Sequence, residues 1–168
     1  MEAIPHMAGG RAGSGAKFAG EPWSGERPVI ADDLGSTSKS PEERARVSGP
    51  GLRTFANIAA LWRLTEVQQA CAIGAPSVVV YREWLEAARE HKDLVLEMDV
   101  LLHISAILGI YASLRTLYGP DTEVLDWLER RNLHKQFSGR PPLELILGGD
   151  FEVQMQVRRN LAAICAGN

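Results

Sequence analysis

The sequence predicts an all-α fold behind a leader rich in Gly and Pro. From Leu52 onward, apolar residues recur at the i, i+3 and i+4 spacing of a helix that buries one face. Capping residues and helix breakers separate one periodic stretch from the next. The β-branched run 78–80 is flanked by helical pattern, so we expect no strand there and assign the chain to the all-α class.

The leader is expected to be disordered over residues 1–48. Its large apolar residues are isolated and show no period, and Gly and Pro are frequent. Such a segment buries too little apolar surface to offset the entropy lost on ordering. The stretch Ser40–Arg46 can form one helical turn, but no apolar pattern suggests that it packs. The folded part is therefore predicted to begin close to Leu52.

Three helices are expected between residues 52 and 90. The first has its apolar face on Leu52, Phe55, Ile58, Ala59 and Trp62. Thr65 and Gln68 fit a capping box that opens a short helix ending at Gly74. Pro76 is expected at the first position of the next helix. The predicted buried stripe of that helix is Val80, Trp84, Leu85 and Ala88.

The remaining chain is predicted to hold one long helix followed by shorter ones. The long helix covers roughly residues 96–117, and its wide apolar face predicts a central, largely buried position. Gly119-Pro120 ends this helix, and Asp121 is expected to cap the next one. Asp150 is expected to cap the final helix. The predicted buried face of the final helix is Val153, Val157, Leu161 and Ile164.

Composition and charge exclude several classes of protein. The 18 Lys and Arg residues against 21 Asp and Glu residues give a formal net charge of −3, which argues against a nucleic-acid coat protein. Two cysteines, Cys71 and Cys165, are too few for a disulfide-stapled secreted scaffold. The apolar run Leu101–Leu114 is too short to span a membrane, and the N-terminus has no apolar signal core. We therefore expect a cytoplasmic protein with reduced thiols and no membrane association.

The sequence shows no catalytic or metal-binding constellation. Its four histidines lack the paired spacing of metal ligands, and no nucleophile elbow occurs. His103 lies in the apolar helix and is expected to be a hydrogen-bonded core or interface side chain. Cys71 is expected to be a small buried apolar residue. We therefore expect no enzymatic activity, no metal and no cofactor.

The strongest local geometry is a helix, a tight turn and a second helix between Thr65 and Glu90. In a DNA-binding unit, the second helix would present to the groove Ser77, Val78, Tyr81 and Arg82. Only Arg82 is a good reader of base edges, and Glu83 beside it repels phosphate. The alternative is an architectural helix pair that builds the core and a dimer interface.

A motif in the C-terminal part resembles a known family. It consists of Trp127-Leu128, then Asn132, then the run Phe137-Ser138-Gly139-Arg140-Pro141-Pro142-Leu143-Glu144-Leu145-Ile146. This order resembles the C-terminal toxin-binding domain of Xre/MbcA/ParS-type antitoxins. Upstream, Leu64-Thr65-Glu66 and residues 101–111 resemble the Xre-like helix-turn-helix half of the same antitoxins. The resemblance covers residues 52–168.

The resemblance implies two folded units and a function. Residues 52–118 would be an Xre-like helix-turn-helix domain, and residues 119–168 would be the toxin-binding domain. The chain would be a bacterial type II antitoxin, whose usual partner is a RES-type toxin that consumes NAD. In such families the C-terminal part of the antitoxin covers the nucleotide cleft of the toxin. The helix-turn-helix half would support a homodimer within a hetero-oligomer and repress the shared operon.

The motif residues are expected to be mainly scaffold. Gly139 permits a sharp turn, and Pro141 or Pro142 presets the start of a helix. The expected scaffold is Trp127, Asn132, Phe137, Gly139, Pro141, Pro142 and Leu143. The expected toxin contacts are exposed arginines and the small residues of the chain end, namely Arg140, Arg158, Arg159, Ala166, Gly167 and Asn168.

A second function stays open from the sequence. The chain can be a DNA-binding transcriptional regulator without a toxin partner, with Ser77, Tyr81 and Arg82 as its DNA contacts. The expected recognition helix, Ala75–Ala88, lacks the run of Arg, Tyr and hydroxyl residues usual in the family, which argues against operator binding. An adjacent gene for a RES-type protein favours the antitoxin, whereas an isolated gene favours the regulator.

Overall fold

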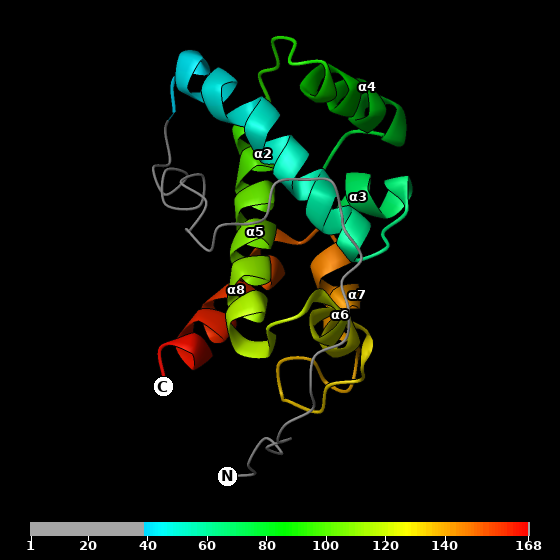
Figure 1. The fold of residues 1–168 in the computed structure, drawn as a ribbon, viewed down its shortest axis with the longest axis vertical. Coiled ribbons are helices and arrows are strands. Elements are labelled where there is room, and N and C mark those ends of the chain that lie inside the picture. The colour runs from blue at the N-terminus through cyan, green and yellow to red at the C-terminus, as the bar shows by residue number, and fades with distance from the viewer. Residues whose placement is uncertain (1–38, 168) are drawn as a thin grey trace.

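The helices of this protein surround one central helix. The computed structural model describes residues 39–167, which form seven α-helices and no strand, as the sequence predicts. In chain order they are α2 (Pro41–Leu61), α3 (Glu66–Ala72), α4 (Val78–Arg89), α5 (Met98–Tyr118), α6 (Asp121–Glu129), α7 (Pro142–Leu147) and α8 (Phe151–Cys165). Helix α5 runs through the middle, with α2 and α8 packed along it (Figure 1). The predicted leader lies outside the described residues as far as residue 38.

Helix α2 begins well before the predicted start of the folded part. Its first residue is Pro41, and a reciprocal capping box joins Ser40 to Glu43: the Glu43 amide donates to Ser40 Oγ and the Ser40 amide donates to Glu43 Oε2. The assignment of residues 41–48 to a disordered leader is therefore wrong. Ser40-x-x-Glu43 has the same spacing as the Thr65 capping box and is the signal that marks this start.

The first turns of α2 are held by the segment that leads into α5. Arg44 Nη1 donates to the Leu96 carbonyl and pairs with Glu97 Oε2, both at 3.0 Å. The amide of Leu96 donates in turn to Ser48 Oγ at 2.9 Å, and Ser48 is fully buried. These contacts are made by polar side chains, so apolar periodicity does not reveal them.

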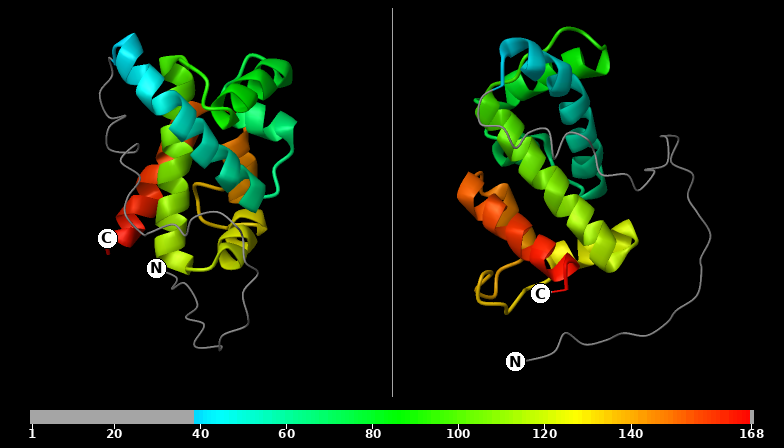
Figure 2. Two further views of the ribbon diagram at one scale, coloured as in Figure 1. Left: turned by 45° about the horizontal axis from the view of Figure 1, so that its top comes forward. Right: turned by 90° about the vertical axis from the view of Figure 1, so that its left-hand side faces the viewer.

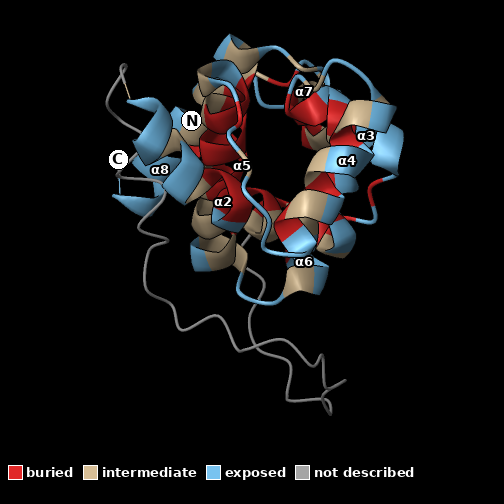
Figure 3. Ribbon diagram, turned by 90° about the horizontal axis from the view of Figure 1, so that it is seen from above, coloured by how far each residue is buried: buried red, intermediate tan, exposed pale blue. Residues whose placement is uncertain are grey.

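Helix α5 lies at the centre of the core. Its buried residues occur all around the helix, and the view from above shows it almost wholly buried (Figure 3). By length and composition alone α5 is apolar enough to cross a membrane, contrary to the expectation from Leu101–Leu114, but 56% of its most apolar window is buried inside the protein. A central helix of a helical bundle has this same composition because neighbours cover every face.

Helices α5 and α8 run parallel, side by side (Figure 2). His103 on α5 meets Gln154 on α8, and ten residues later along α5 the Ser113 carbonyl accepts from Cys165 Sγ. The contact partners thus advance together along both helices. Because α8 belongs to the C-terminal half of the chain and α5 to the preceding half, this packing joins the two predicted domains.

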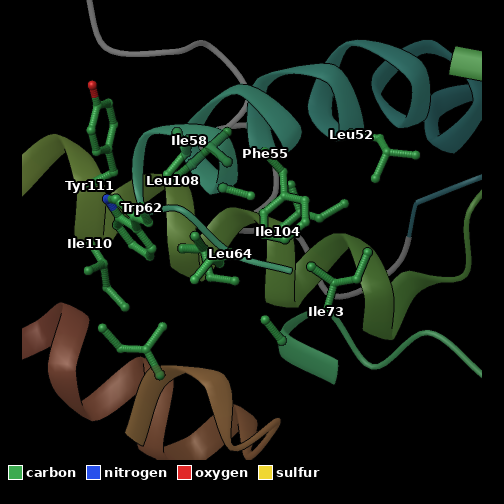
Figure 4. Packing of buried hydrophobic residues seen from close by; sticks show 14 of the residues in the cluster. Leu52, Phe55, Ile58, Trp62, Leu64, Ile73, Ile104, Leu108, Ile110 and Tyr111 are labelled. Atoms are coloured by element: carbon green, nitrogen blue, oxygen red, sulfur yellow. The ribbon is translucent and has the colours of Figure 1, made fainter. Parts of the chain in front are cut away.

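A single apolar cluster extends through both halves. It includes Leu52 and Phe55 from α2, Ile104 from α5, and Val157 and Leu161 from α8. Figure 4 shows side chains of α2 and α5 from this cluster, together with Leu64 and Ile73 from the segments before and after α3. The boundary predicted at residues 118 and 119 coincides with the turn between α5 and α6, but the core continues across it.

Most predicted helix ends are observed, and two are displaced. Thr65 and Gln68 form the capping box, and Asp150 accepts from the Glu152 and Val153 amides. Pro76 does not open α4, because Ser77 is the N-cap. Asp121 is not a cap either: Pro120 occupies that position, and Asp121 Oδ1 accepts from Tyr111 Oη at 2.9 Å and from Arg115.

Candidate functional site

The motif residues of the C-terminal half form a small scaffold between α6 and α7. The rings of Trp127 and Phe137 meet edge to face, with centroids 5.7 Å apart and planes at 88°. Phe137 is buried, and both Trp127 and Leu143 pack against the main core. Trp127, Phe137 and Leu143, which are expected from the sequence to be scaffold residues, therefore pack inward.

Backbone hydrogen bonds fold the loop 130–140 back on itself. The Gly139 amide donates to the Asn132 carbonyl at 2.9 Å, and the Asn132 amide donates to the Arg140 carbonyl at 3.3 Å. Asn132 Oδ1 also accepts from the His134 amide. Gly139 has φ +77°, in the left-handed region that glycine favours, so the predicted sharp turn is observed.

The two prolines occupy successive positions at the start of α7. Pro142 is the first helical residue, where a missing N–H costs no helical hydrogen bond, and it is buried. Pro141 stands at the N-cap with extended backbone. Of the two alternatives open from sequence, Pro142 therefore presets the helix start.

The predicted arginine contacts fall into two groups. Arg140 and Arg159 are exposed, and Arg159 makes only a long contact of 3.9 Å to Glu152. Arg158 is half-buried instead, because its guanidinium lies against Gly109 and Nη1 donates to Ser105 Oγ at 3.3 Å. The expectation that Arg158 is an exposed contact is wrong. Arg158 instead contributes to the packing of α8 against α5.

The end of the chain exposes small side chains beyond the last core residue. Leu161 is buried, and every described residue after it is exposed, including Ala166 and Gly167. Asn168 lies outside the described residues. Ile164 is 46% exposed, so its predicted place on the buried face is wrong. The exposed end of α8 is therefore narrow and only weakly apolar.

Gln154 is a buried polar residue that the periodicity did not identify. Its Nε2 donates to the Ala72 and Ile146 carbonyls, each at 2.8 Å. Because both amide hydrogens are used in this way, Oε1 accepts from Nδ1 of His103 at 2.8 Å. Gln154 thus ties α3, α5 and α7 to α8. The prediction that His103 is a hydrogen-bonded core residue is confirmed.

The helix pair α3–α4 has the expected turn but a different buried face. Gly74, at φ +69°, provides the turn. Tyr81 is fully buried, with its hydroxyl on Gln69 Oε1 and its ring edge-on to Phe55. The prediction that Tyr81 faces a DNA groove is therefore wrong. Burial raises the pKa of Tyr81 to about 12.

The other predicted DNA contacts are exposed, but their polar groups are engaged. Ser77 caps α4 by accepting from the Val80 amide. Arg82 pairs with Glu66 Oε2 at 2.6 Å, which joins α4 to the start of α3. Beside this pair lies an open groove of about 450 Å³, lined by Glu66, Arg82, Leu85, Glu86, Arg89 and Glu90. The exposed side of α4 therefore carries at least as many acidic as basic side chains.

The two candidate surfaces lie at opposite ends of the molecule. Helix α4 is at the upper right of Figure 1, and the C-terminal end of α8 is at the lower left, an arrangement that the further views repeat (Figures 1 and 2). The loop 130–140 belongs to the same end as α8, because Asn160 Nδ2 donates to Gln136 Oε1. Arg140 and the chain end therefore share one side of the protein, away from Arg82.

Both cysteines are free and exposed. Cys71 is exposed, so the expectation of burial is wrong, and Cys165 is exposed as well. Within residues 39–167 no group of three or more His, Cys, Asp or Glu side chains could hold a metal ion.

Comparison with known proteins places the chain in a family. No family model matches it, and no solved structure matches it significantly. The uncharacterized protein y4oB of Sinorhizobium fredii (strain NBRC 101917 / NGR234) is 30% identical over 126 residues, which cover 75% of this chain and 92% of that protein. A similarity that extends over almost the whole relative reflects a shared fold and not a shared local motif. The chain belongs to the same family as y4oB.

Proposed function

We propose that this chain is a type II antitoxin that binds a RES-type NAD-consuming toxin and occludes its nucleotide cleft. One observation supports this proposal above the others. The residues of the antitoxin-like motif pack inward as a scaffold, and they present Arg140 and the exposed end of α8 on one side of the protein. An antitoxin that blocks the nucleotide cleft of a toxin sterically needs a rigid scaffold, here the motif residues, and a narrow segment that can enter the cleft, here the end of α8.

The inhibitory element in this proposal is the last turn of α8 with the residues after it. Residues 162–167 are exposed, and several of them are alanine or glycine. Small side chains enter a nucleotide cleft that a bulky helix end cannot enter. Arg159 lies on the same helix with its charge largely free, and a charge-assisted hydrogen bond formed inside a closed interface is worth more than an exposed pair.

Arg158 has a different part in this proposal. Its guanidinium fills the space beside Gly109 and fixes the angle at which α8 lies on α5. It therefore positions the inhibitory element without contacting the toxin. The toxin contacts that we propose are Arg140, Arg159 and the residues from Ala166 to Asn168.

Operator binding is the second candidate function. It is favoured by the helix, tight turn and helix of α3 and α4, with Ser77 and Arg82 on the exposed side. The pairing of Arg82 with Glu66 and the acidic residues around it weaken this candidate, because phosphate contacts dominate affinity for DNA. We expect weak or partner-dependent binding in a cytoplasmic, homodimeric antitoxin that autorepresses its operon.

Operator binding is tested with DNA from upstream of the gene. If α4 reads bases, Arg82→Ala should weaken specific binding by about 1–3 kcal/mol, the contribution of a bidentate base contact. Specific binding that is unchanged in Arg82→Ala would show that α4 is not the reader. Specific binding in the absence of any toxin partner would favour the regulator.

Toxin binding is tested by co-expression with the product of the adjacent gene. The expected result is a complex that survives affinity purification and size exclusion. Leu161→Asp is the matched disruptive variant, because it places a charge where Leu161 is 2% exposed. Gln156→Asp adds the same charge at an exposed position of α8 that lies before its last turn, and it serves as the control. Failure of the folded wild-type chain to bind the adjacent product would contradict the proposed function.

A further inference from the structure

The loop 130–140 is the most basic surface segment of the described protein. It carries Arg130, Arg131, Lys135 and Arg140, all of them exposed, and it contains no acidic residue. The whole chain has a formal charge of −3, so this concentration of positive charge is local. Charge of one sign on a short ordered loop favours an encounter with a surface of the opposite sign.

The basic side chains of the loop, like the exposed Arg46 and Arg89, are not engaged in ion pairs with the described residues. Elsewhere in residues 39–167, ion pairs engage Arg44, Arg82, Lys92, Arg115 and Arg159. Within the same described residues, no ion pair involves a cation of the loop 130–140. Arg131 Nε donates to the Gly139 carbonyl, which orders the loop without neutralising its charge. The positive charge is therefore available to a partner.

Leu133 lies between Arg131 and Lys135 in this basic loop, and its side chain is 89% exposed. It is the most exposed large apolar residue among the described residues. The next most exposed, Val67 and Val79, lie on α3 and α4 and not in this loop. Its neighbour Asn132 holds the turn on both sides through backbone and side-chain hydrogen bonds. Burial of this exposed leucine against a partner would remove its apolar surface from water, which is favourable.

We propose that the loop 130–140 docks on an acidic surface of a protein partner that has an apolar recess for Leu133. This inference rests on the proposed function in one respect, which is that the partner is the toxin. The loop is then a second contact beside the end of α8, on the same side of the molecule.

A protein fits this surface better than a nucleic acid does. A single-stranded nucleic acid would stack bases on exposed aromatic rings, but Phe137 is buried beneath the loop, and the exposed ring of His134 is the one such ring that the loop offers. The projecting side chain is aliphatic, and aliphatic anchors bind in apolar recesses of proteins.

The first experiment measures the affinity of the adjacent gene product for the full chain. Leu133→Ser and the double variant Lys135→Glu/Arg140→Glu should each bind at least tenfold more weakly than the wild type. The dissociation constant of the double variant should also depend less on ionic strength. The matched control is Arg46→Glu/Arg89→Glu, which makes the same charge change at exposed positions on α2 and α4 and should bind as the wild type does.

The second experiment tests the loop independently of the toxin. The ¹⁵N-labelled chain is titrated at low salt with hexaglutamate and, separately, with a 20-base-pair DNA duplex. Hexaglutamate should shift the amide signals of residues 130–140, and Lys135→Glu/Arg140→Glu should abolish the shifts. Shifts confined to other residues, no shifts, or tighter binding of the duplex at the loop would overturn the proposal.

The two experiments separate the two claims. If the wild type binds the adjacent product and the loop variants bind equally well, the docking loop is wrong while the antitoxin function stands. If the wild type does not bind that product, the antitoxin function is wrong, and the hexaglutamate titration decides whether the loop is an acid-binding surface.

Discussion

Gln154 accepts a hydrogen bond from His103 at 2.8 Å in the interior, while its amide nitrogen donates to carbonyls at the ends of α3 and α7. One side chain thus connects the helix-turn-helix part of the chain with its C-terminal part. The His103 ring also lies edge-on to Phe151 and close to Gly74. The turn between α3 and α4 therefore packs against the same histidine that donates to Gln154. The two halves of the antitoxin-like pattern are therefore expected to unfold together.

Removal of the Gln154 amide should lower the free energy of unfolding substantially. In Gln154→Ala, two carbonyls and His103 lose their partner inside the protein, and unpaired buried polar groups are expensive. We expect a loss of about 3 kcal/mol in the free energy of unfolding. Urea unfolding followed by circular dichroism measures it, and Gln156→Ala, at an exposed position of the same helix, should change it little. Equal stabilities of the two variants would contradict the role assigned to Gln154.

Gly109 and Arg158 should show strong energetic coupling. A Cβ at Gly109 would lie 2.4 Å from Arg158 Nε, so Gly109→Ala must displace the guanidinium, and we expect a loss of about 1–3 kcal/mol. In an Arg158→Ala background the clash is absent. The higher helix propensity of Ala should then make Gly109→Ala neutral or stabilising by up to about 1 kcal/mol. A double-mutant cycle measured by urea unfolding checks this change of sign, and additive effects would contradict it.

Stability should fall at alkaline pH because of Tyr81 and Tyr111. Burial raises the pKa of each to about 12, and for Tyr111 the hydrogen bond to Asp121 adds to the effect. Tyrosines of the unfolded chain ionise near pH 10, so the folded state holds more protons between these values. The stabilising contribution is complete below about pH 10 and is lost as the pH rises toward 12.

The measurement is the free energy of unfolding at pH 9, 10 and 11. The double variant Tyr81→Phe/Tyr111→Phe should lose stability less steeply with pH than the wild type. Comparison of slopes removes the contribution of lysines, which titrate in both proteins. Identical slopes would contradict the assignment to these two phenols.

The class of fold and its central element could be predicted from the sequence because both depend on local pattern. The wide apolar face of residues 98–118 is visible without any knowledge of partners, and the Thr65 capping box and Asp150 cap act within one turn of chain. Gly139 is equally local, since its left-handed backbone is required by the turn itself. Features of this kind are fixed by residues close together in sequence.

The start of α2 could not be predicted from apolar periodicity alone. Gly49, Pro50 and Gly51 indicate a break, yet all three lie inside the helix. A Cβ at Gly51 would lie 3.7 Å from Ile104, which is an ordinary van der Waals contact, so Gly51 faces α5 within the continuous helix. Whether a glycine breaks a helix or lies inside one depends on the packing of neighbouring helices, which the local sequence does not contain.

The buried faces of α4 and α8 were predicted only in part. Leu85 and Ala88 on α4, and Val157 and Leu161 on α8, are buried as expected, and the remaining positions differ for a related reason. Val80 and Trp84 are apolar and fitted the stripe, but α2 lies on the side of Tyr81, and its hydroxyl finds Gln69. On α8 a glutamine is buried where apolar residues were expected, because three neighbouring groups need its hydrogen bonds. Arg158 likewise is half-buried because Gly109 leaves room for it.

The exposed end of α8 should be dispensable for folding and necessary for inhibition. Ala166 and Gly167 are exposed, so the unfolding curve after deletion of residues 166–168 should match that of the wild type. The same deletion, and separately Arg159→Ala, should weaken neutralisation of the adjacent gene product in a growth assay. If both variants fold and both neutralise fully, the end of α8 does not occlude the cleft, and inhibition must come from the surface between Trp127 and Ile146.

The most direct test of the antitoxin function is the NAD content of cells that make the adjacent gene product with or without this chain. We predict that NAD falls when that product is made alone, is maintained when the wild-type chain is made with it, and falls again with Leu161→Asp, in which α8 cannot pack. NAD that stays constant when the adjacent product is made alone, or that falls in spite of abundant folded wild-type chain, would contradict the proposed function.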